Sequence, residues 1–383
     1  MRKSIKGGVA VICAALLAGC GGSKIVREEP AKLQDFAAEM RVKEVWTADT
    51  GTSAVDKAVT LSPSLDGNVI YTSDPKGQVN AFAADNGHRL WKARVRLPVT
   101  GAIAVGDGLV VVATKKGEVV ALDRADGHRL WVDNVSSEVL APAAIHAGVV
   151  VVQSVDGKLA GLAEAEGKKL WTYERQEPAL SLYGTATPVT ADDMVLTGFA
   201  SGKIVAFQIQ DGKLLWEMPV AQPHGRNEIE RLVDVDASPL VVGNVLFAAS
   251  YQGKVIAVDL QTNRILWSRD MSTYTGMDAD TKNLYLTDDH SNVIALDQHT
   301  GASVWKQEHL RSRQLNAPRC VEGAVAVGDF EGYVHWLSVE DGHFVARFRV
   351  KHSPIRAQAQ VSGDILYVSS QSGELAALRL EKN

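Results

Sequence analysis

The fold is decided by the phrase KGEVVALDRADGHRLW at 116–131, which returns along the whole chain. Further copies are KGQVNAFAADNGHRLW (76–91), DGKLAGLAEAEGKKLW (156–171), SGKIVAFQIQDGKLLW (201–216) and QGKVIAVDLQTNRILW (252–267), with weaker copies HSNVIALDQHTGASVW (290–305) and EGYVHWLSVEDGHFVA (331–346). In every copy the tryptophan slot follows the first turn position by fourteen residues. A fixed offset that recurs along a chain indicates one structural unit used repeatedly.

Each repeat divides into four short strands. An apolar stretch precedes each phrase, such as VVVV at 149–152, and a stretch of small residues such as APAA at 141–144 comes before it. Enrichment in valine and isoleucine between Gly, Asp and Asn turns is typical of strands joined by hairpins. Four strands in a repeat of about 40 residues predict one blade of a β-propeller.

The two ends of the chain carry complementary parts of one repeat. An eighth phrase begins as SGELAALRLEKN at 372–383 and stops before its tryptophan, whereas RVKEVW at 41–46 carries a tryptophan without a preceding phrase. An N-terminal strand that completes the last blade closes the ring. The sequence therefore predicts an all-β fold over residues 41–383, an eight-bladed β-propeller of four-stranded antiparallel blades, with the last blade closed by the N-terminal strand.

The positions that recur among the copies of the phrase have a structural explanation. The glycines are expected to supply the positive φ of tight turns, and the tryptophans to pack between blades. Trp336 lies off the register and Ala346 occupies its slot, so that blade is expected to pack differently. The aspartates at 123, 259 and 297 recur at one position and are expected to accept hydrogen bonds within turns.

Composition excludes several classes of function. The 383 residues are 46% hydrophobic and 22% charged, which is typical of a chain with a packed core. A net charge of −5 provides no basic field for nucleic acid. The three cysteines at 13, 20 and 320 form neither a disulfide framework nor a zinc motif. We therefore expect no nucleic-acid partner, no metal and no cofactor.

Catalytic motifs are also missing from the sequence. It contains no Gly-x-Ser-x-Gly elbow, HExxH helix or P-loop. His88, His128 and His343 all follow a turn glycine at the same place in the repeat, so they are expected on the surface of turns. No catalytic residue is predicted.

The N-terminus has the layout of an export signal. Arg2, Lys3 and Lys6 precede an apolar run at 9–18, which is too short to span a bilayer of about 30 Å. The run ends in LAGC at 17–20, which resembles the lipobox of bacterial lipoproteins. An ordinary signal peptide with an incidental cysteine is the alternative.

The lipobox divides the N-terminal region into two expected parts. Residues 1–19 are predicted to be a lipoprotein signal peptide, and residues 20–40 a tether whose first residue, Cys20, carries lipid. Gly21 stands where an aspartate would resemble an inner-membrane retention signal, which favours the outer membrane.

The repeat resembles that of proteins related to pyrroloquinoline-quinone dehydrogenases. Together with the lipobox, the eight copies and the split last blade, it resembles the BamB family, lipoproteins of the outer-membrane β-barrel assembly machinery. The segments EPALSL at 177–182 and IERLVDVD at 229–236 are similar to that family in particular. The resemblance implies a non-enzymatic scaffold on the periplasmic face of the outer membrane of a Gram-negative bacterium, which supports folding and insertion of outer membrane proteins.

Two other functions stay open at this stage. Quinone-dependent dehydrogenases of this repeat type carry adjacent cysteines against the cofactor, whereas a chain processed before Cys20 keeps only Cys20 and Cys320, far apart. A degenerate relative of these enzymes is therefore one alternative. The other is a periplasmic propeller that binds a small ligand.

A partner surface is expected where the repeat spacing departs from its norm. The intervals Gly157 to Gly202 and Gly202 to Gly253 span 45 and 51 residues, whereas the others span 38 to 41. Apolar and charged side chains in these two insertions predict a protein-binding patch, made of Leu180, Leu182, Tyr183, Arg231, Asp234 and Asp236. The alternative is that the two leucines fold back onto the core and the aspartates cap turns.

The family resemblance gives this patch a partner. It implies docking of a periplasmic domain of the barrel-forming subunit, BamA, beside other lipoproteins of the machinery. Tyr183 stands where an arginine is expected in the family, so packing but no ion pair is expected there. Unfolded outer membrane proteins are a further expected class of partner, through strand addition to a blade edge.

Overall fold

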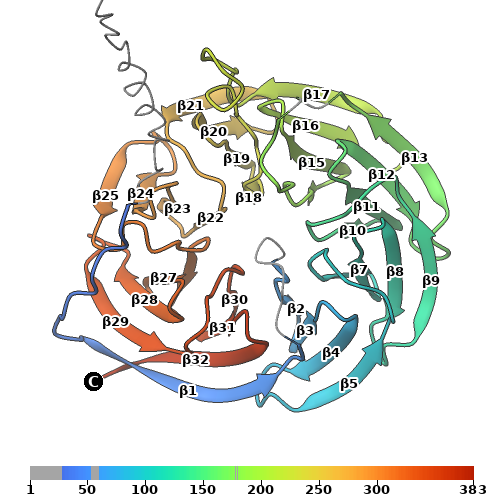
Figure 1. Ribbon diagram of the computed structural model, residues 1–383. Coiled ribbons are helices and arrows are strands. Elements are labelled where there is room, and N and C mark those ends of the chain that lie inside the picture. Colours follow the sequence, from blue (N-terminus) through green and yellow to red (C-terminus); the bar gives the residue numbers. More distant parts are fainter. Residues whose placement is uncertain (1–27, 53–59, 177, 179) are drawn as a thin grey trace, which may run out of the picture.

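The computed structural model describes residues 28–52, 60–176, 178 and 180–383. These residues form thirty-two strands in eight four-stranded antiparallel sheets, arranged as a ring of blades (Figure 1). The predicted signal peptide and Cys20 lie outside the described residues. None of the described residues belongs to a helix long and apolar enough to cross a membrane. The predicted all-β, eight-bladed propeller is confirmed.

The blades follow one another along the chain, each with its innermost strand first. Blades 1 and 2 consist of β2 (Ser64–Asp66), β3 (Val69–Ser73), β4 (Gln78–Ala83), β5 (Arg89–Arg94), β6 (Ala104–Gly106), β7 (Leu109–Ala113), β8 (Glu118–Asp123) and β9 (Arg129–Asn134). Blades 3 and 4 consist of β10 (Ala144–His146), β11 (Val149–Gln153), β12 (Lys158–Ala163), β13 (Lys169–Glu174), β14 (Val189–Ala191), β15 (Met194–Phe199), β16 (Lys203–Gln208) and β17 (Leu214–Pro219).

The second half of the ring repeats this order and ends in the composite blade. Blades 5 and 6 consist of β18 (Leu240–Val242), β19 (Val245–Ala249), β20 (Lys254–Asp259), β21 (Arg264–Asp270), β22 (Met277–Ala279), β23 (Asn283–Thr287), β24 (Val293–Asp297) and β25 (Ser303–Gln307). Blades 7 and 8 consist of β26 (Arg319–Val321), β27 (Ala324–Gly328), β28 (Tyr333–Ser338), β29 (Phe344–Arg349), β30 (Gln360–Ser362), β31 (Ile365–Ser369), β32 (Glu374–Lys382) and β1 (Met40–Asp49).

The burial of a strand depends on its position within the blade. In blade 3 the second strand, β11, is buried at every residue, because both of its faces pack against neighbouring blades. The outermost strand, β13, is buried only at Trp171, and the residues flanking that tryptophan are exposed. The core therefore lies between the blades, in clusters that each join residues of two adjacent sheets.

Ring closure joins the two ends of the chain. β1 pairs antiparallel with β32, from Met40 opposite Lys382 to Asp49 opposite Glu374. An ion pair between Arg41 and Glu381, at 2.6 Å, lies across the same two strands. Since β1 is the outermost strand of the last blade, the predicted closure by the N-terminal strand is confirmed (Figure 1).

At six of the eight blade boundaries, the tryptophan of one blade packs on the second glycine of the next blade's phrase. Between blades 4 and 5 this position is Asn263, which also has a positive φ of 54°. A Cβ atom added to Gly127 would lie 2.7 Å from Cε3 of Trp91, and the Trp91 indole N–H donates to the carbonyl of Arg124 at 3.0 Å. The same joint recurs around the ring in the pairs Trp46–Gly87, Trp131–Gly167, Trp171–Gly212, Trp267–Gly301 and Trp305–Gly342. Each of these glycines has positive φ as well, so glycine is required both by the turn and by the indole above it.

The joint between blades 7 and 8 is different, as expected. Ala346 fills the tryptophan slot and is buried, and Trp336 on the adjacent strand is paired with it and buried in the same core cluster. The reason lies in the ring closure. β32 and β1 come from opposite ends of the chain, so no glycine turn connects them and no glycine is there to receive an indole.

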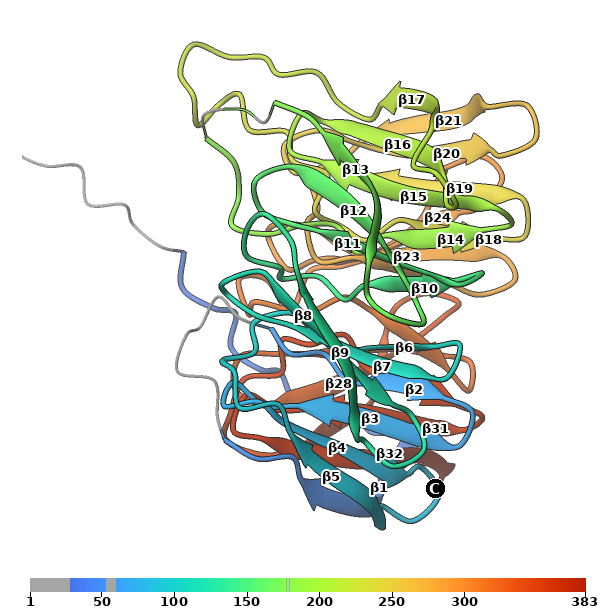
Figure 2. The same cartoon turned by 90° about the vertical axis from the view of Figure 1, so that its right-hand side faces the viewer.

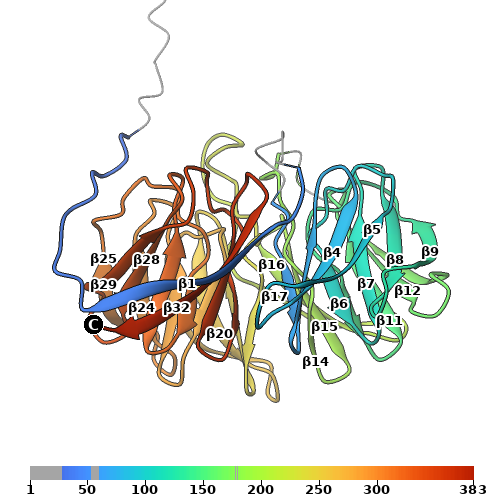
Figure 3. The ribbon, with the colours of Figure 1, turned by 90° about the horizontal axis from the view of Figure 1, so that it is seen from below.

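Part of the predicted tether is docked on the propeller. Residues 28–39, called the strap below, run along blade 7 before β1 begins (Figure 3). Phe36 packs on Phe344 with ring centroids 5.4 Å apart, and Leu33 packs against the core cluster between blades 6 and 7. These two apolar side chains pack residues 28–39 on the folded domain, within the stretch 20–40 that the sequence assigned to a tether.

The indole joint can be tested with two glycines that both have positive φ, 76° at Gly127 and 87° at Gly108. Alanine at Gly127 meets the Trp91 ring, whereas alanine at Gly108, also at positive φ, has no atom within 4 Å of its Cβ. Both changes carry the left-handed penalty of about 1–2 kcal/mol. Gly127→Ala is expected to lower the free energy of unfolding by about 1–3 kcal/mol more than Gly108→Ala because of overpacking. Urea unfolding followed by tryptophan fluorescence measures both, and equal losses would contradict the joint.

Candidate functional site

The two long insertions form neighbouring loops on one face of the ring. Loop A, residues 175–188, connects β13 to β14, and loop B, residues 220–239, connects β17 to β18. Both run from the outermost strand of one blade to the innermost strand of the next. Figure 2 and Figure 3 show them on the same face of the propeller, and residues 177 and 179 of loop A are not described.

Loop A turns two apolar side chains outward. Leu180 is 42% exposed and Tyr183 is 54% exposed. The Tyr183 hydroxyl donates a hydrogen bond of 2.7 Å to Oε2 of Glu138, a buried residue in the connection between β9 and β10. Leu182 is half-buried, and its backbone N–H points inward to Oδ1 of Asp234 at 2.9 Å. The loop is thus pinned at two points while Leu180 and Tyr183 face solvent.

Asp234 is a buried carboxylate that joins three segments. It is 1% exposed, its Oδ1 accepts the Leu182 N–H of loop A, and its carbonyl accepts the N–H of Tyr251 at 2.8 Å from the turn between β19 and β20. Its Oδ2 is buried and has no hydrogen-bond partner among the described residues. Burial raises the pKa of this carboxyl, and the Leu182 N–H offsets part of the shift. Asp234 therefore holds the loops together from beneath the surface.

Asp236 acts at the same boundary. A Cβ atom on Gly184 would lie 2.7 Å from Oδ2 of Asp236, so the backbone of loop A comes this close only because residue 184 is glycine. Asp236 is half-buried. The structure thus brings Leu182 to Asp234 and Gly184 to Asp236, so both aspartates lie at the contact between the loops.

Loop B is braced by its own side chains. The N–H of Glu230 donates to Oδ1 of Asn227 at 2.9 Å, and the Glu230 carboxylate accepts the N–H of Arg226 at 2.7 Å. This turn presents Ile229, which is 66% exposed, and Arg231, which is also exposed. Ile229 is a surface residue that sequence reasoning passed over, although an isoleucine within a polar loop is itself a signal.

The six predicted residues therefore play two different parts. Leu180, Tyr183 and Arg231 are exposed, whereas Leu182 and Asp236 are half-buried and Asp234 is buried. The alternative in which both leucines fold back onto the core does not describe Leu180. Apolar side chains beside a charge, on loops held in place from below, are typical of a protein-binding surface. The exposed set, with Ile229 added, is called the loop patch below.

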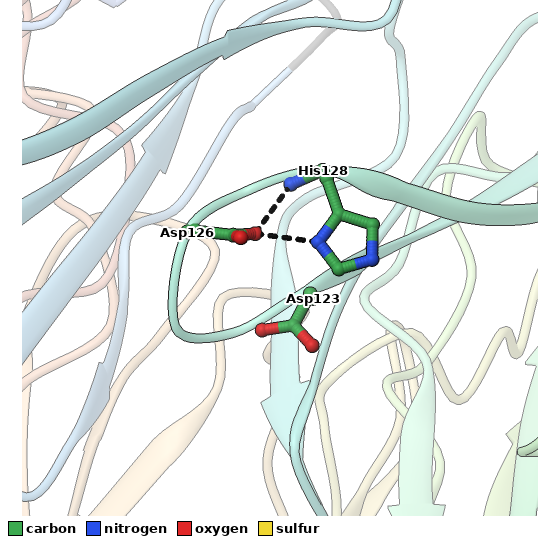
Figure 4. A group of neighbouring side chains, drawn as sticks. All are labelled: Asp123, Asp126 and His128. Carbon is green, nitrogen blue, oxygen red and sulfur yellow. Dashed lines mark hydrogen bonds and ion pairs between the residues drawn. The ribbon is translucent and has the colours of Figure 1, made fainter.

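A separate group of side chains could in principle hold a metal ion. Asp123, Asp126 and His128 place one ligand atom each within 4.8 Å of one another (Figure 4). Their hydrogen bonds belong to the turn, since Oδ1 of Asp126 accepts both the backbone N–H of His128, at 2.9 Å, and its ring Nδ1, at 2.6 Å. Asp341 and His343 repeat this pair in blade 7. The group is thus explained by the repeat, as predicted for Asp123 and His128.

Cysteine chemistry gives no support to a quinone enzyme. The sequence has no adjacent cysteines, and Cys320 is the one cysteine within the described part of the chain. Burial and the nearby Asp278 raise the pKa of its thiol, so the thiol stays protonated at neutral pH. Cys320 is half-buried.

Comparison with known proteins gives one consistent answer. The sequence profile of the family described as outer membrane protein assembly factor BamB matches residues 75–307. A relative named outer membrane protein assembly factor BamB, from Pseudomonas aeruginosa, is 48% identical over 370 residues, which cover 95% of this chain and 97% of the relative. A relative of the same name from Alkalilimnicola ehrlichii is also 48% identical, over 97% of this chain and 96% of its own length.

Solved structures agree with the sequence matches. The crystal structure of BamB from Moraxella catarrhalis superimposes with a TM-score of 0.81 at 27% identity, covering 88% of this chain and all of that one. Quinohemoprotein alcohol dehydrogenase from Comamonas testosteroni, at 12% identity and a TM-score of 0.68 over 88% of this chain and 76% of that one, shares the fold alone. The chain belongs to the family of the outer membrane protein assembly factor BamB.

Proposed function

We propose that this propeller is a non-enzymatic scaffold that binds a BamA-like barrel subunit of the outer-membrane assembly machinery through the loop patch, and so supports folding and insertion of outer membrane proteins. The observation that carries the proposal is the arrangement of Leu180, Tyr183, Ile229 and Arg231 on two loops held by one buried carboxylate. Family membership supplies the kind of partner. Other lipoproteins of the machinery are proposed to join the same complex.

The geometry favours binding because the described part of loop A is held at two points before a partner arrives. Asp234 and Glu138 each fix one point of loop A, so little conformational entropy remains to be lost there on association. Apolar side chains held in the open gain free energy when a partner covers them, at about 25 cal/mol per Å² of apolar surface. The proposed partner that covers these side chains is a periplasmic domain of the barrel subunit.

The N-terminal region supplies the proposed attachment to the membrane. Residues 1–19 would be removed as a signal peptide, and acyl chains on Cys20 would hold the protein on the periplasmic face of the outer membrane. Each buried methylene of such a chain contributes about 0.8 kcal/mol.

A second role, contact with unfolded client proteins, has its own structural support. The outermost strands leave one edge unpaired within each described sheet. The residue just before the tryptophan is apolar and exposed on six of these strands, namely at Leu90, Leu130, Leu170, Leu215, Leu266 and Val304. Such edges suit the addition of an extended, amphipathic segment of a client.

Two leucines of equal exposure test the loop patch. Leu180 in loop A and Leu130 on β9 are both 42% exposed. Leu180→Asp is expected to reduce co-purification of the barrel subunit from detergent extracts at least tenfold, about 1.4 kcal/mol or more of binding free energy. Leu130→Asp is expected to leave it unchanged. Undiminished recovery with a folded Leu180→Asp variant would refute the assigned surface.

Substitutions of Asp234 separate its support of loop A from direct contact with a partner. Asparagine keeps an acceptor for the Leu182 N–H without the buried charge, so Asp234→Asn is expected to retain the partner. Asp234→Ala leaves that N–H unpaired, which costs about 1–3 kcal/mol of folding free energy and is expected to weaken binding. Loss of binding in the asparagine variant would instead show a direct role for the charge.

The pH dependence of stability gives an independent measurement. Because burial raises the pKa of Asp234 in the folded state, the folded protein bears an ionisation penalty above that pKa. The penalty disappears below the ordinary carboxyl range, where the side chain is protonated in both states. Asp234→Asn is therefore expected to be more stable than the natural protein at pH 7, with the gap narrowing as the pH falls toward 4, in urea unfolding at a series of pH values. A gap that widens on acidification would contradict this account.

A further inference from the structure

The strap begins on the face of the propeller that carries loops A and B. The Glu28 carboxylate pairs with Nε of Arg311 at 2.9 Å and accepts the Ser312 hydroxyl at 3.1 Å. The Ala31 N–H donates to the carbonyl of Arg311 at 2.9 Å. Arg311 and Ser312 lie between β25 and β26, in a connection from an outermost strand to the next innermost strand. Loops A and B are connections of the same kind, so all three lie on one face.

The middle of the strap is held by an arginine of β29. The Arg347 guanidinium lies over the Phe36 ring, 5.0 Å from its centroid, and donates from Nη1 to the carbonyl of Gln34 at 3.0 Å. The same arginine lies 5.2 Å from the centroid of Phe344. One side chain thus secures both the backbone and the aromatic anchor of the strap.

Beneath the strap lies a buried network that fixes the orientation of these arginines. Arg313 is 3% exposed, donates to the carbonyl of Ala31 at 2.9 Å and pairs with the buried Asp329 at 2.7 Å. The ring of His335 lies between Asp329, 3.0 Å from Nε2, and Nε of Arg347, 3.0 Å from Nδ1. Since the Arg347 N–H donates to Nδ1, the histidine is the neutral tautomer with its proton on Nε2. The strap is therefore attached to the core by four linked side chains, Arg313, Asp329, His335 and Arg347.

The strap crosses the rim of blade 7 from one face to the other. Its last residue, Glu39, donates its N–H to the carbonyl of Val345 at 3.0 Å and pairs through Oε1 with His343 at 3.0 Å, next to the hairpin between β28 and β29. β1 then runs back toward the loop-bearing face (Figure 3). Glu28, the first residue that the structure describes, consequently lies at the loop-bearing face.

The length of chain between Cys20 and Glu28 limits how the propeller can sit on a membrane. Cys20 and Glu28 are eight residues apart, and a chain of that length spans at most about 26–29 Å when fully extended. Laying the opposite face on the lipid would require this segment to pass the thickness of the ring. Strands of six residues, such as β9, account for about 20 Å of that thickness before the hairpins are added.

We propose that the docked strap holds the face bearing loops A and B toward the lipid surface in which Cys20 is anchored. The partner of the loop patch is then a segment that lies between the propeller and the membrane, close to the bilayer. This inference rests on the lipid anchor of the proposed function. It also requires that the strap stay docked on the propeller, whereas anchoring by lipid does not require a docked strap.

Energy transfer to a labelled membrane tests the orientation. The lipidated full chain, with Cys320→Ser, would carry a donor dye at Ser181→Cys in loop A or at Thr281→Cys in the turn between β22 and β23 on the opposite face. Both positions are exposed. On phosphatidylethanolamine–phosphatidylglycerol vesicles with acceptor-labelled headgroups, transfer from position 181 is expected to be at least about twofold higher, since the two heights differ by at least the ~20 Å strand length. Equal transfer, or higher transfer from position 281, would overturn the proposal.

Two arginines on one strand provide the matched control for the strap. Arg347→Ala removes the contacts to Gln34 and Phe36 and is expected to bring the two transfer efficiencies together. Arg349→Ala removes only contacts within blade 7, to the carbonyl of Glu331 and the ring of Tyr333, and is expected to preserve the difference. A difference that survives Arg347→Ala would show that the strap does not set the orientation.

The anchor is tested separately by flotation of the unlabelled chain with the same vesicles. Failure to float would contradict the lipid on Cys20. Orientation is then measured with six histidines in place of residues 1–19 and nickel-chelating lipid in the vesicles. The same twofold difference is expected there, and equal transfer would again overturn the proposal.

Discussion

The packing of an indole on a glycine of the next blade is the interaction on which this ring depends. Most copies of the phrase supply both halves of a joint, a glycine that receives a tryptophan from the blade before and a tryptophan that covers a glycine of the blade after. The copy at 252–267 has Asn263 in place of the glycine, and the copy at 331–346 has Ala346 in place of the tryptophan. A single blade therefore completes neither of its joints alone. The Trp46–Gly87 joint between the last blade and the first requires β1, because Trp46 belongs to that strand, so closure of the ring and completion of its packing are one event.

Where this joint is altered, the structure uses other contacts. Between blades 7 and 8 no glycine turn exists, Ala346 replaces the tryptophan, and Trp336 fills the core from the neighbouring strand. The outermost strand of the same blade 7 is the strand covered by the strap through Phe36 and Arg347. The composite blade thus has two consequences. It removes one regular joint, and it leaves the N-terminal chain beside blade 7, where it packs.

Repeated contacts could be predicted from the sequence, and contacts that occur once could not. The blades, the closure and the role of the tryptophans follow from positions that recur at a fixed offset, so each copy supports the others. The bond between the Leu182 N–H and Asp234 joins residues 52 apart, in the two insertions that depart from the repeat spacing. Sequence placed Asp234 in the partner surface among charged residues, whereas the structure buries it. The strap was missed for the same reason, since Leu33 and Phe36 are two apolar residues in a polar segment with no period.

Burial of Asp234 makes physical sense only as a constraint on the loops. A carboxylate with one buried, unpaired oxygen is less favourable for folding than an apolar residue of similar size. Its bond to Leu182 does, however, tie loop A, which connects blades 3 and 4, to loop B, which connects blades 4 and 5. Its carbonyl also accepts a hydrogen bond from Tyr251, in the turn before β20. The eight-bladed ring supplies a rigid base, and this carboxylate carries that rigidity into the two longest insertions. Stability is thus given up locally so that Leu180 and Tyr183 are held in place while exposed, which is what a binding surface on loops requires.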